Sequence, residues 1–229
     1  MKSDSLLIIF VKAPHTGLVK TRLLPQFSPE QASQLYRAMV EDLLTQFKLP
    51  RAFDVRLMYW PADSNNLIQS WVGTGWQVEP QIPGDLGEKM AAAFKKTLQE
   101  GYKKVLLIGS DVPLLNREII ETSFQFLESH DVVLGPSEDG GYYLVGMTTP
   151  RLEIFEGVAW SRDGVLSQTL KNARSHRYSV YLLERLFDVD EYGDVIRLWS
   201  MLQEDKGGVL RNRLPGTFHQ LRIHFQKNR

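Results

Sequence analysis

The stretch Leu6–Leu23, LLIIFVKAPHTGLVKTRL, decides the fold, because it joins a continuous apolar run to a cationic loop. The run Leu6–Val11 does not alternate with polar residues, which is typical of a parallel strand that is covered on both faces. The loop carries Lys12, Lys20 and Arg22, and cations this close repel one another unless an anion binds or solvent screens them. We therefore expect a central strand that leads into a loop suited to an anion.

This loop is not a Walker A loop. Gly17, Lys20 and Thr21 follow the order in which that motif ends, but the motif requires Gly directly before Lys. Here Leu18 and Val19 intervene. A phosphate at this position would be held by a loop of another kind.

Helical and strand-like segments alternate along the rest of the chain. Ser28, Pro29 and Gln31 predict a helix start with a capping box, and apolar residues then repeat at helical spacing up to Phe47, as a stripe for the sheet. Further strands are predicted at 53–60, 76–81, 103–109, 131–136, 142–147 and 178–184, and further helices at 67–72, 88–101, 117–130, 162–174 and 192–203. The turn-rich segment 137–141 either joins two strands or reshapes an edge of the sheet. The pattern predicts a single-domain α/β fold with a mostly parallel central sheet flanked by helices.

The composition is that of an ordinary globular chain. Its 229 residues fit one large α/β domain, and 43% are apolar and 24% charged. The formal net charge is +0, so net charge does not steer the protein toward nucleic acid or an anionic membrane. Cysteine is absent, which excludes disulfides and thiolate metal sites and is consistent with the cytoplasmic location that we expect. The N-terminal apolar run is too short for a membrane span.

The last segment, residues 206–229, differs in charge from the rest. It has no acidic residue and carries Lys206, Arg211, Arg213, Arg222, Lys227 and Arg229. We interpret it as a solvated or sheet-edge extension rather than a nucleic-acid arm, because it contains no recognisable binding module. The expected organisation is one domain at 1–205 followed by a basic C-terminal extension at 206–229.

Acidic residues gather in the loops where such a fold binds ligands. In open α/β sheets ligands lie beyond the carboxyl ends of the strands, and four of the five loops expected there contain Asp, while the first contains Lys and Arg. This division indicates Mg²⁺ or Mn²⁺ held by carboxylates beside a phosphate held by cations. Asp111 directly follows a buried strand and is the first candidate ligand. The alternatives to metal binding are a helix or turn cap for Asp111, a helix cap for Asp190 and a turn role for Asp139.

Five of these segments resemble those of a known family, in the same order along the chain: KAPHTGLVKTRL, QIPGDLGEKM, GSDVPLL, EDGGYYLVG and DVDEYGD. The family consists of bacterial proteins assigned as glycosyltransferases with the GT-A, nucleotide-diphospho-sugar transferase fold. The likeness runs from about Leu6 to Asp194, and the pattern K-x-P-x-x-G-x-V-K-T-R-L is its most specific part. The layout is also similar to that of sugar-phosphate, molybdopterin and phospholactate nucleotidylyltransferases.

The resemblance implies a role for each motif. The loop after the first strand would wrap the nucleotide phosphates with Lys12, Gly17, Lys20 and Arg22. The motif after the third strand would read the base with Gln81, Gly84 and Asp85. Mg²⁺ or Mn²⁺ would be held by Asp111, with Asp190 as the second ligand.

Two departures leave this sequence between two chemistries. The first loop has one glycine where nucleotidylyltransferases have several, and Asp111 is not part of the D-x-D motif of typical GT-A glycosyltransferases. We favour a metal-dependent transferase with a nucleotide-activated sugar as donor, in which Asp139 or Asp163 activates an acceptor hydroxyl. One alternative is a nucleotidylyltransferase that joins an NTP to a phosphorylated small molecule. The other is a noncatalytic nucleotide-binding or interaction protein.

Overall fold

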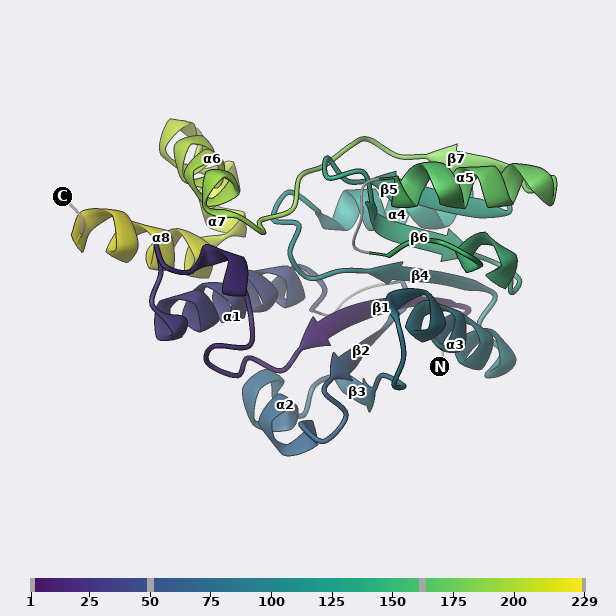
Figure 1. Cartoon of the computed structure of the whole chain (residues 1–229), viewed down its shortest axis with the longest axis horizontal. Coiled ribbons are helices and arrows are strands. Elements are labelled where there is room, and N and C mark those ends of the chain that lie inside the picture. The colour runs from purple at the N-terminus through teal and green to yellow at the C-terminus, as the bar shows by residue number, and fades with distance from the viewer. Residues whose placement is uncertain (1–2, 49–51, 161–163, 228–229) are drawn as a thin grey trace.

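The computed structural model describes residues 3–48, 52–160 and 164–227. Within these residues a seven-stranded sheet has the order β3-β2-β1-β4-β6-β5-β7 (Figure 1). The strands are β1 (Ser5–Lys12), β2 (Asp54–Trp60), β3 (Gln77–Pro80), β4 (Lys104–Ile108), β5 (Val132–Pro136), β6 (Tyr142–Met147) and β7 (Val180–Leu182). Only β6 runs antiparallel to its neighbours among these strands. The predicted α/β fold with a mostly parallel sheet is confirmed.

Helices cover both faces of the sheet. They are α1 (Pro29–Gln46), α2 (Asn65–Val72), α3 (Leu86–Gln99), α4 (Arg117–Phe126), α5 (Val165–Ser175), α6 (Tyr192–Glu204), α7 (Val209–Arg213) and α8 (Pro215–Lys227), with short 3-10 helices η1 (Thr21–Leu23) and η2 (Leu152–Phe155). A first apolar core, on one face, contains residues of α1, α2 and α4, and a second, on the other face, contains residues of α3, α5 and η2. Leu7 and Ile9 of β1 enter the first core and Leu6 and Ile8 the second, which explains why the run in β1 does not alternate.

Helix α1 is buried on two sides rather than one. Its predicted capping box is present, because the Ser28 side chain accepts from the backbone N–H of Gln31 and the Gln31 side chain accepts from that of Ser28. Tyr36 and Leu43 face the sheet as predicted. Met39 belongs instead to a third core that α1 shares with α6 and α8. The apolar stripe of α1 therefore serves two contacts.

The segment 137–141 joins two neighbouring strands. It connects β5 to β6, which pair antiparallel, and β6 lies between β5 and β4. The predicted strand at 178–184 is shorter, Val180–Leu182. Of the helix predicted at 162–174, the structure describes α5 from Val165 onward; residues 162 and 163 lie outside the described residues.

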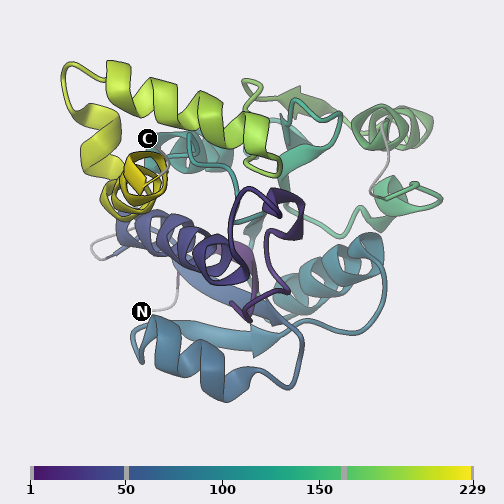
Figure 2. The ribbon, with the colours of Figure 1, turned by 60° about the vertical axis from the view of Figure 1, so that its left-hand side comes forward.

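The segment after Asp205 is not a solvated or sheet-edge extension, which corrects the prediction. Its described part forms α7 and α8, and α8 packs beside α1 and α6 (Figures 1 and 2). Leu214 and Leu221 are buried in the third core. Asp42 of α1 accepts hydrogen bonds from the backbone N–H groups of Gly216 and Thr217, so α1 caps the start of α8. The division at residue 205 remains a prediction.

Within the described part of the chain, no helix combines the length and the apolar composition that crossing a membrane requires.

Candidate active site

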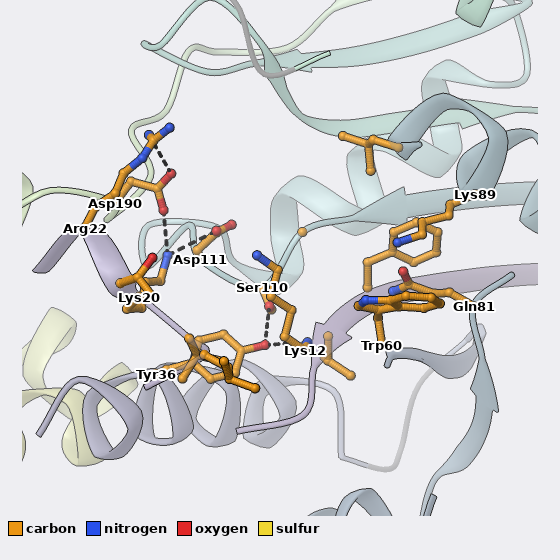
Figure 3. Close-up of a pocket in the computed structure, with 17 residues that line it drawn as sticks. Lys12, Lys20, Arg22, Tyr36, Trp60, Gln81, Lys89, Ser110, Asp111 and Asp190 are labelled. Atoms are coloured by element: carbon orange, nitrogen blue, oxygen red, sulfur yellow. Dashed lines mark hydrogen bonds and ion pairs between the residues drawn. The ribbon is translucent and has the colours of Figure 1, made fainter. Parts of the chain in front are cut away.

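Two adjacent cavities, which share several lining residues, lie at the carboxyl end of the sheet. The basic chamber, of about 510 Å³, is lined by four cations, Lys12, Lys20, Arg22 and Lys89, together with Trp60 and Gln81 (Figure 3). The acidic chamber, of about 410 Å³, is lined by four carboxylates, Asp111, Asp139, Asp188 and Asp190, together with Tyr142 and Trp160. Arg22, Asp111 and Asp190 line both chambers and so mark their junction.

Lys20 lines the basic chamber and contacts two of the three junction residues, Asp111 and Asp190. Its backbone adopts φ 50° and ψ 41°, a left-handed conformation that is uncommon outside glycine. Its Nζ lies 3.1 Å from Asp111 Oδ2 and 2.9 Å from Asp190 Oδ1, and its side chain is only 5% exposed. Burial alone would lower the pKa of Lys20, but the two carboxylates outweigh burial and raise it above its usual value. The ammonium group is therefore charged throughout the neutral range.

The four carboxylates differ in their electrostatic surroundings. Burial alone would raise the pKa of Asp111, but Lys20 outweighs it and holds that pKa below its usual value. Among the described residues no cation lowers the pKa of Asp188: burial, followed by repulsion from Asp139, raises it to about 6. The acidic chamber thus carries repulsion between carboxylates that a bound cation would relieve.

Arg22 is the exposed partner of the junction. One guanidinium nitrogen lies 3.6 Å from Asp190 Oδ2, and the side chain is 64% exposed. An exposed guanidinium group retains N–H donors for a ligand and has the fork geometry that matches a phosphate. Arg22 can therefore contact a group in either chamber.

The far end of the basic chamber has aromatic and amide groups. Lys89 Nζ lies 4.0 Å from the centroid of the Trp60 ring, and Gln81 lies beside them (Figure 3). The Gln81 Nε2 donates to the carbonyl of Met58 at 2.8 Å. Because this bond uses the amide nitrogen, the amide oxygen remains as an acceptor for a ligand.

Several predicted residues are not brought into the two chambers. Gly17 and Gly84 line neither chamber, although both have positive φ, 80° and 128°, which a non-glycine residue rarely adopts. Asp85 also lies outside the two linings, and its side chain accepts from the backbone N–H of Glu88 as the N-cap of α3. Asp163 lies outside the described residues.

The alternatives for three aspartates have different outcomes. Asp190 does not cap α6, because the N-cap is Glu191. Asp111 binds Lys20 through its side chain. Asp139 does act as a turn residue, since its Oδ1 accepts from Ser137 Oγ and from the backbone N–H of Gly141, while the same residue lines the acidic chamber.

Sequence reasoning missed several residues of the site, among them Trp60, Tyr36 and Asp188. The local patterns place Trp60 only in a strand and Tyr36 only in the core stripe of α1. Asp188 shares a loop with Asp190, and a structural role is the simpler interpretation for both. In a single sequence, the one signal that could have identified Asp188 is its position at the end of a strand-like segment, in a loop with Asp190.

Asp111 and Asp190 present the donor set that a hard divalent cation prefers. One oxygen of each lies near a single point, Lys20 Nζ, so the two carboxylates already converge on one cation. Among the described residues, no group of three or more His, Cys, Asp or Glu side chains could hold a metal ion. The pair therefore fits an ion such as Mg²⁺, which is often bound by one or two carboxylates and completes its shell with water and substrate phosphates.

The strand order, and the site at the carboxyl end of the sheet, place the chain in the nucleotide-diphospho-sugar transferase fold. Residues 43–162 match the family described as "Uncharacterized protein conserved in bacteria (DUF2064)", and the protein belongs to this family. A crystal structure from Desulfovibrio desulfuricans G20, described as a candidate nucleotide-diphospho-sugar transferase, is 30% identical to this chain. The structural alignment covers 97% of this chain and 98% of the D. desulfuricans chain, with a TM-score of 0.86.

Two curated relatives carry a different activity in their names. The 3-phospho-D-glycerate guanylyltransferase of Phenylobacterium zucineum (strain HLK1) is 27% identical over 56% of this chain and 60% of its own length. The 2-phospho-L-lactate guanylyltransferase of Methanobrevibacter ruminantium (strain ATCC 35063 / DSM 1093 / JCM 13430 / OCM 146 / M1) is 21% identical over 62% of this chain and 64% of its own length. The chain thus spans less than two thirds of these relatives. The predicted relation to both groups of transferases is confirmed.

Proposed function

We propose that the protein is a metal-dependent nucleotidyltransferase that transfers a nucleotidyl group from an NTP to a phosphorylated small acceptor and releases pyrophosphate. The observation that carries this proposal is the position of Lys20, whose ammonium group lies between two carboxylates where a basic and an acidic chamber meet. A nucleotide in the first chamber and an acceptor in the second would meet at this point. The names of the two curated guanylyltransferases support an NTP as donor over a sugar nucleotide.

The basic chamber suits a nucleotide along its length. Lys12, Lys20 and Arg22 would contact the phosphates, because cations and phosphates form charge-assisted hydrogen bonds. Trp60 would stack on the base at the other end. The free amide oxygen of Gln81 would accept from the base, and guanine offers its amino group as a donor.

The chemistry at the junction is a displacement at phosphorus. A phosphate oxygen of the acceptor forms a bond to the α-phosphorus, and the bond from the α-phosphorus to the oxygen that bridges to the β-phosphorus breaks. The acceptor phosphate needs no deprotonation, so no general base is required. Lys20 and Arg22 would stabilise the charge on the α-phosphate and on the departing pyrophosphate.

Asp111 and Asp190 would hold the divalent cation, Mg²⁺ or Mn²⁺, which supplies a Lewis acid for the phosphate oxygens. Lys20 pairs with both carboxylates, so one positive charge faces two negative charges. With a divalent cation held by these carboxylates, the ammonium group of Lys20 would be available to the phosphates.

A nucleotide-sugar transferase is the second candidate, and the acidic chamber favours it. Tyr142 and Trp160 offer aromatic surface to a sugar, and among the described lining residues Arg22 is the only cation for an acceptor phosphate. The description of the relative from D. desulfuricans G20 also supports this reaction. Asp139 would then serve as the base for an acceptor hydroxyl, with Asp163 as the other proposed base.

Product analysis separates the candidates. The full chain is incubated with Mg²⁺, each of the four NTPs, and either 3-phospho-D-glycerate or 2-phospho-L-lactate, and pyrophosphate release is measured. In parallel it is incubated with UDP- and GDP-sugars, and release of the nucleoside diphosphate is measured. Asp111→Asn serves as the metal-ligand control in both arms.

We expect pyrophosphate from GTP in the presence of one phosphorylated acceptor and none from Asp111→Asn. Release of nucleoside diphosphate from a sugar nucleotide, with no pyrophosphate in the other arm, would establish sugar transfer instead. Nucleotide binding without turnover in either arm would favour the noncatalytic nucleotide-binding protein.

A further inference from the structure

Tyr36 places a buried hydroxyl group inside the basic chamber. The residue belongs to α1, is 3% exposed and lines the chamber. Its Oη accepts a hydrogen bond from the backbone N–H of Lys12 at 2.7 Å and lies 3.2 Å from Ser110 Oγ (Figure 3). One hydroxyl therefore joins the end of β1 to the residue directly before Asp111.

This bridge lies where two strands separate. The pairing of β1 with β4 ends at Ile9 and Ile108, whereas the pairing of β1 with β2 continues to Lys12 and Trp60. Next along the chain, the N–H of Ala13 still donates to the carbonyl of Trp60. Because successive N–H groups of a strand point to opposite sides, the N–H of Lys12 points into the gap beside β4.

The Tyr36 hydroxyl takes the place of the missing ladder bond in that gap. Its oxygen accepts from Lys12, and its proton is available to Ser110 Oγ. Burial raises the pKa of Tyr36 to about 12, so the proton stays on the hydroxyl throughout the neutral range. The gap between β1 and β4 is thus held at one width by a side chain from α1.

We propose that Tyr36 is a positioning residue of the nucleotide site, because its hydroxyl sets the distance between the start of the cationic loop and Asp111. Lys12 starts the loop that carries Lys20 and Arg22, and Ser110 precedes the proposed metal ligand. Changes in this spacing would move the phosphate-binding cations relative to the metal-binding carboxylate. The inference rests on the proposed function and adds to it a residue that does not contact the reacting atoms.

The test compares two buried tyrosines. Tyr36→Phe removes the hydroxyl and keeps the ring. Tyr102→Phe is the matched control: Tyr102 is also 3% exposed, and its hydroxyl donates to Asp54 Oδ2 at 2.9 Å, at the amino end of β2. Ser110→Ala removes one arm of the bridge and leaves Tyr36 unchanged. Thermal unfolding, amide hydrogen exchange at Lys12, Mn²⁺ affinity without nucleotide, and the Kd of GTP with Mg²⁺ are measured for each variant.

We expect both Phe variants to lose a similar, small amount of thermal stability. Tyr36→Phe alone should speed exchange at Lys12 and weaken GTP binding about tenfold, with a smaller loss of about threefold for Ser110→Ala. The KM for GTP should rise in the same order in the two site variants and stay unchanged in Tyr102→Phe.

Two results would overturn the role of Tyr36. GTP and Mn²⁺ affinities that are unchanged in Tyr36→Phe, with a loss of stability equal to that of Tyr102→Phe, would leave Tyr36 as a core residue. If Tyr36→Phe does not fold, unchanged affinities in Ser110→Ala would likewise leave Tyr36 as a core residue.

A wild-type chain that binds Mn²⁺ but no NTP would reject the proposed nucleotide site, while the Mn²⁺ series would still decide on Tyr36. A wild-type chain that binds neither would reject both.

Discussion

Two clusters, each a cation paired with two carboxylates, lie at opposite ends of the same sheet. At the carboxyl end Lys20 contacts Asp111 and Asp190. Toward the amino end of β2, Arg56 lies 3.4 Å from Glu79 and 2.8 Å from Glu100, with its guanidinium group over the ring of Tyr102. Both cations are almost completely buried, since the Lys20 side chain is 5% exposed and that of Arg56 is 7% exposed.

The clusters differ in what surrounds them. The carboxylates beside Lys20 are 39% exposed and line two cavities, whereas Arg56 lines neither cavity. A compact ammonium group can leave its partners for a ligand more easily than a guanidinium group fixed by two carboxylates and a ring. We therefore expect the same pairing of charges to serve ligand exchange at one end and rigidity at the other.

The largest effect is expected at the Lys20 cluster. Lys20→Met should lower kcat/KM by about 10²- to 10³-fold, because a preorganised cation at the developing charge is lost. Steady-state pyrophosphate release measures this effect. Lys103→Met is the control, since Lys103 is 72% exposed, pairs with Asp4 and lies away from the chambers. Equal activity of Lys20→Met and wild type would contradict the assignment.

The second effect is expected at the Arg56 cluster, in stability rather than in activity. Arg56→Met should lower the free energy of unfolding by about 3 kcal/mol, because Glu79 and Glu100 lose their buried partner and keep only the exposed Lys96. Urea denaturation measures this loss, and kcat/KM at a temperature well below unfolding should stay unchanged. A fall in kcat/KM with intact stability would remove the contrast between the two clusters.

Asp42 is a buried carboxylate outside both clusters, held by backbone N–H groups rather than by a cation. Asp42→Ala should lower the free energy of unfolding by about 2 kcal/mol, because the start of α8 loses its cap. Thermal unfolding checks the loss, and Thr45→Ala, on an exposed position of the same helix, is the control. A variant as stable as wild type would show that α8 is held by its apolar contacts alone.

The smallest effect is expected at Asp188. Its pKa in the folded chain is raised to about 6, so the folded state holds a proton that the unfolded chain has lost, and stability falls as pH rises from about 4 to 6. Asp188→Asn removes this loss and should raise the free energy of unfolding at pH 7.5 by about 1 kcal/mol, a value reduced for solvent screening.

Denaturation of wild type and Asp188→Asn at pH 7.5 and at pH 3.5, both with a chelator, measures this difference. It should nearly vanish at pH 3.5, where Asp188 is mostly protonated in both states of the wild type. A gain in stability that is the same at both pH values would show that the substitution acts through packing rather than charge.

Much of the fold could be predicted from local sequence patterns. The apolar run in β1, the capping box of α1 and the alternation of strands and helices each depend on residues within a few positions of one another. The same patterns misled where a segment packs on another. The charge of the basic tail predicts a solvated extension, yet Leu214 and Leu221 are buried against α1 and α6.

The candidate site divides in the same way. The sequence by itself determined which loops meet at the carboxyl end of the sheet, and so it indicated Lys20, Asp111 and Asp190. Only the tertiary structure decided that these three side chains contact one another, that Asp85 caps a helix, and that Tyr36 and Asp188 belong to the site. The physical reason is distance along the chain: Lys20 is separated from its two partners by 91 and 170 positions, and such contacts depend on how helices and strands pack, which no short pattern records.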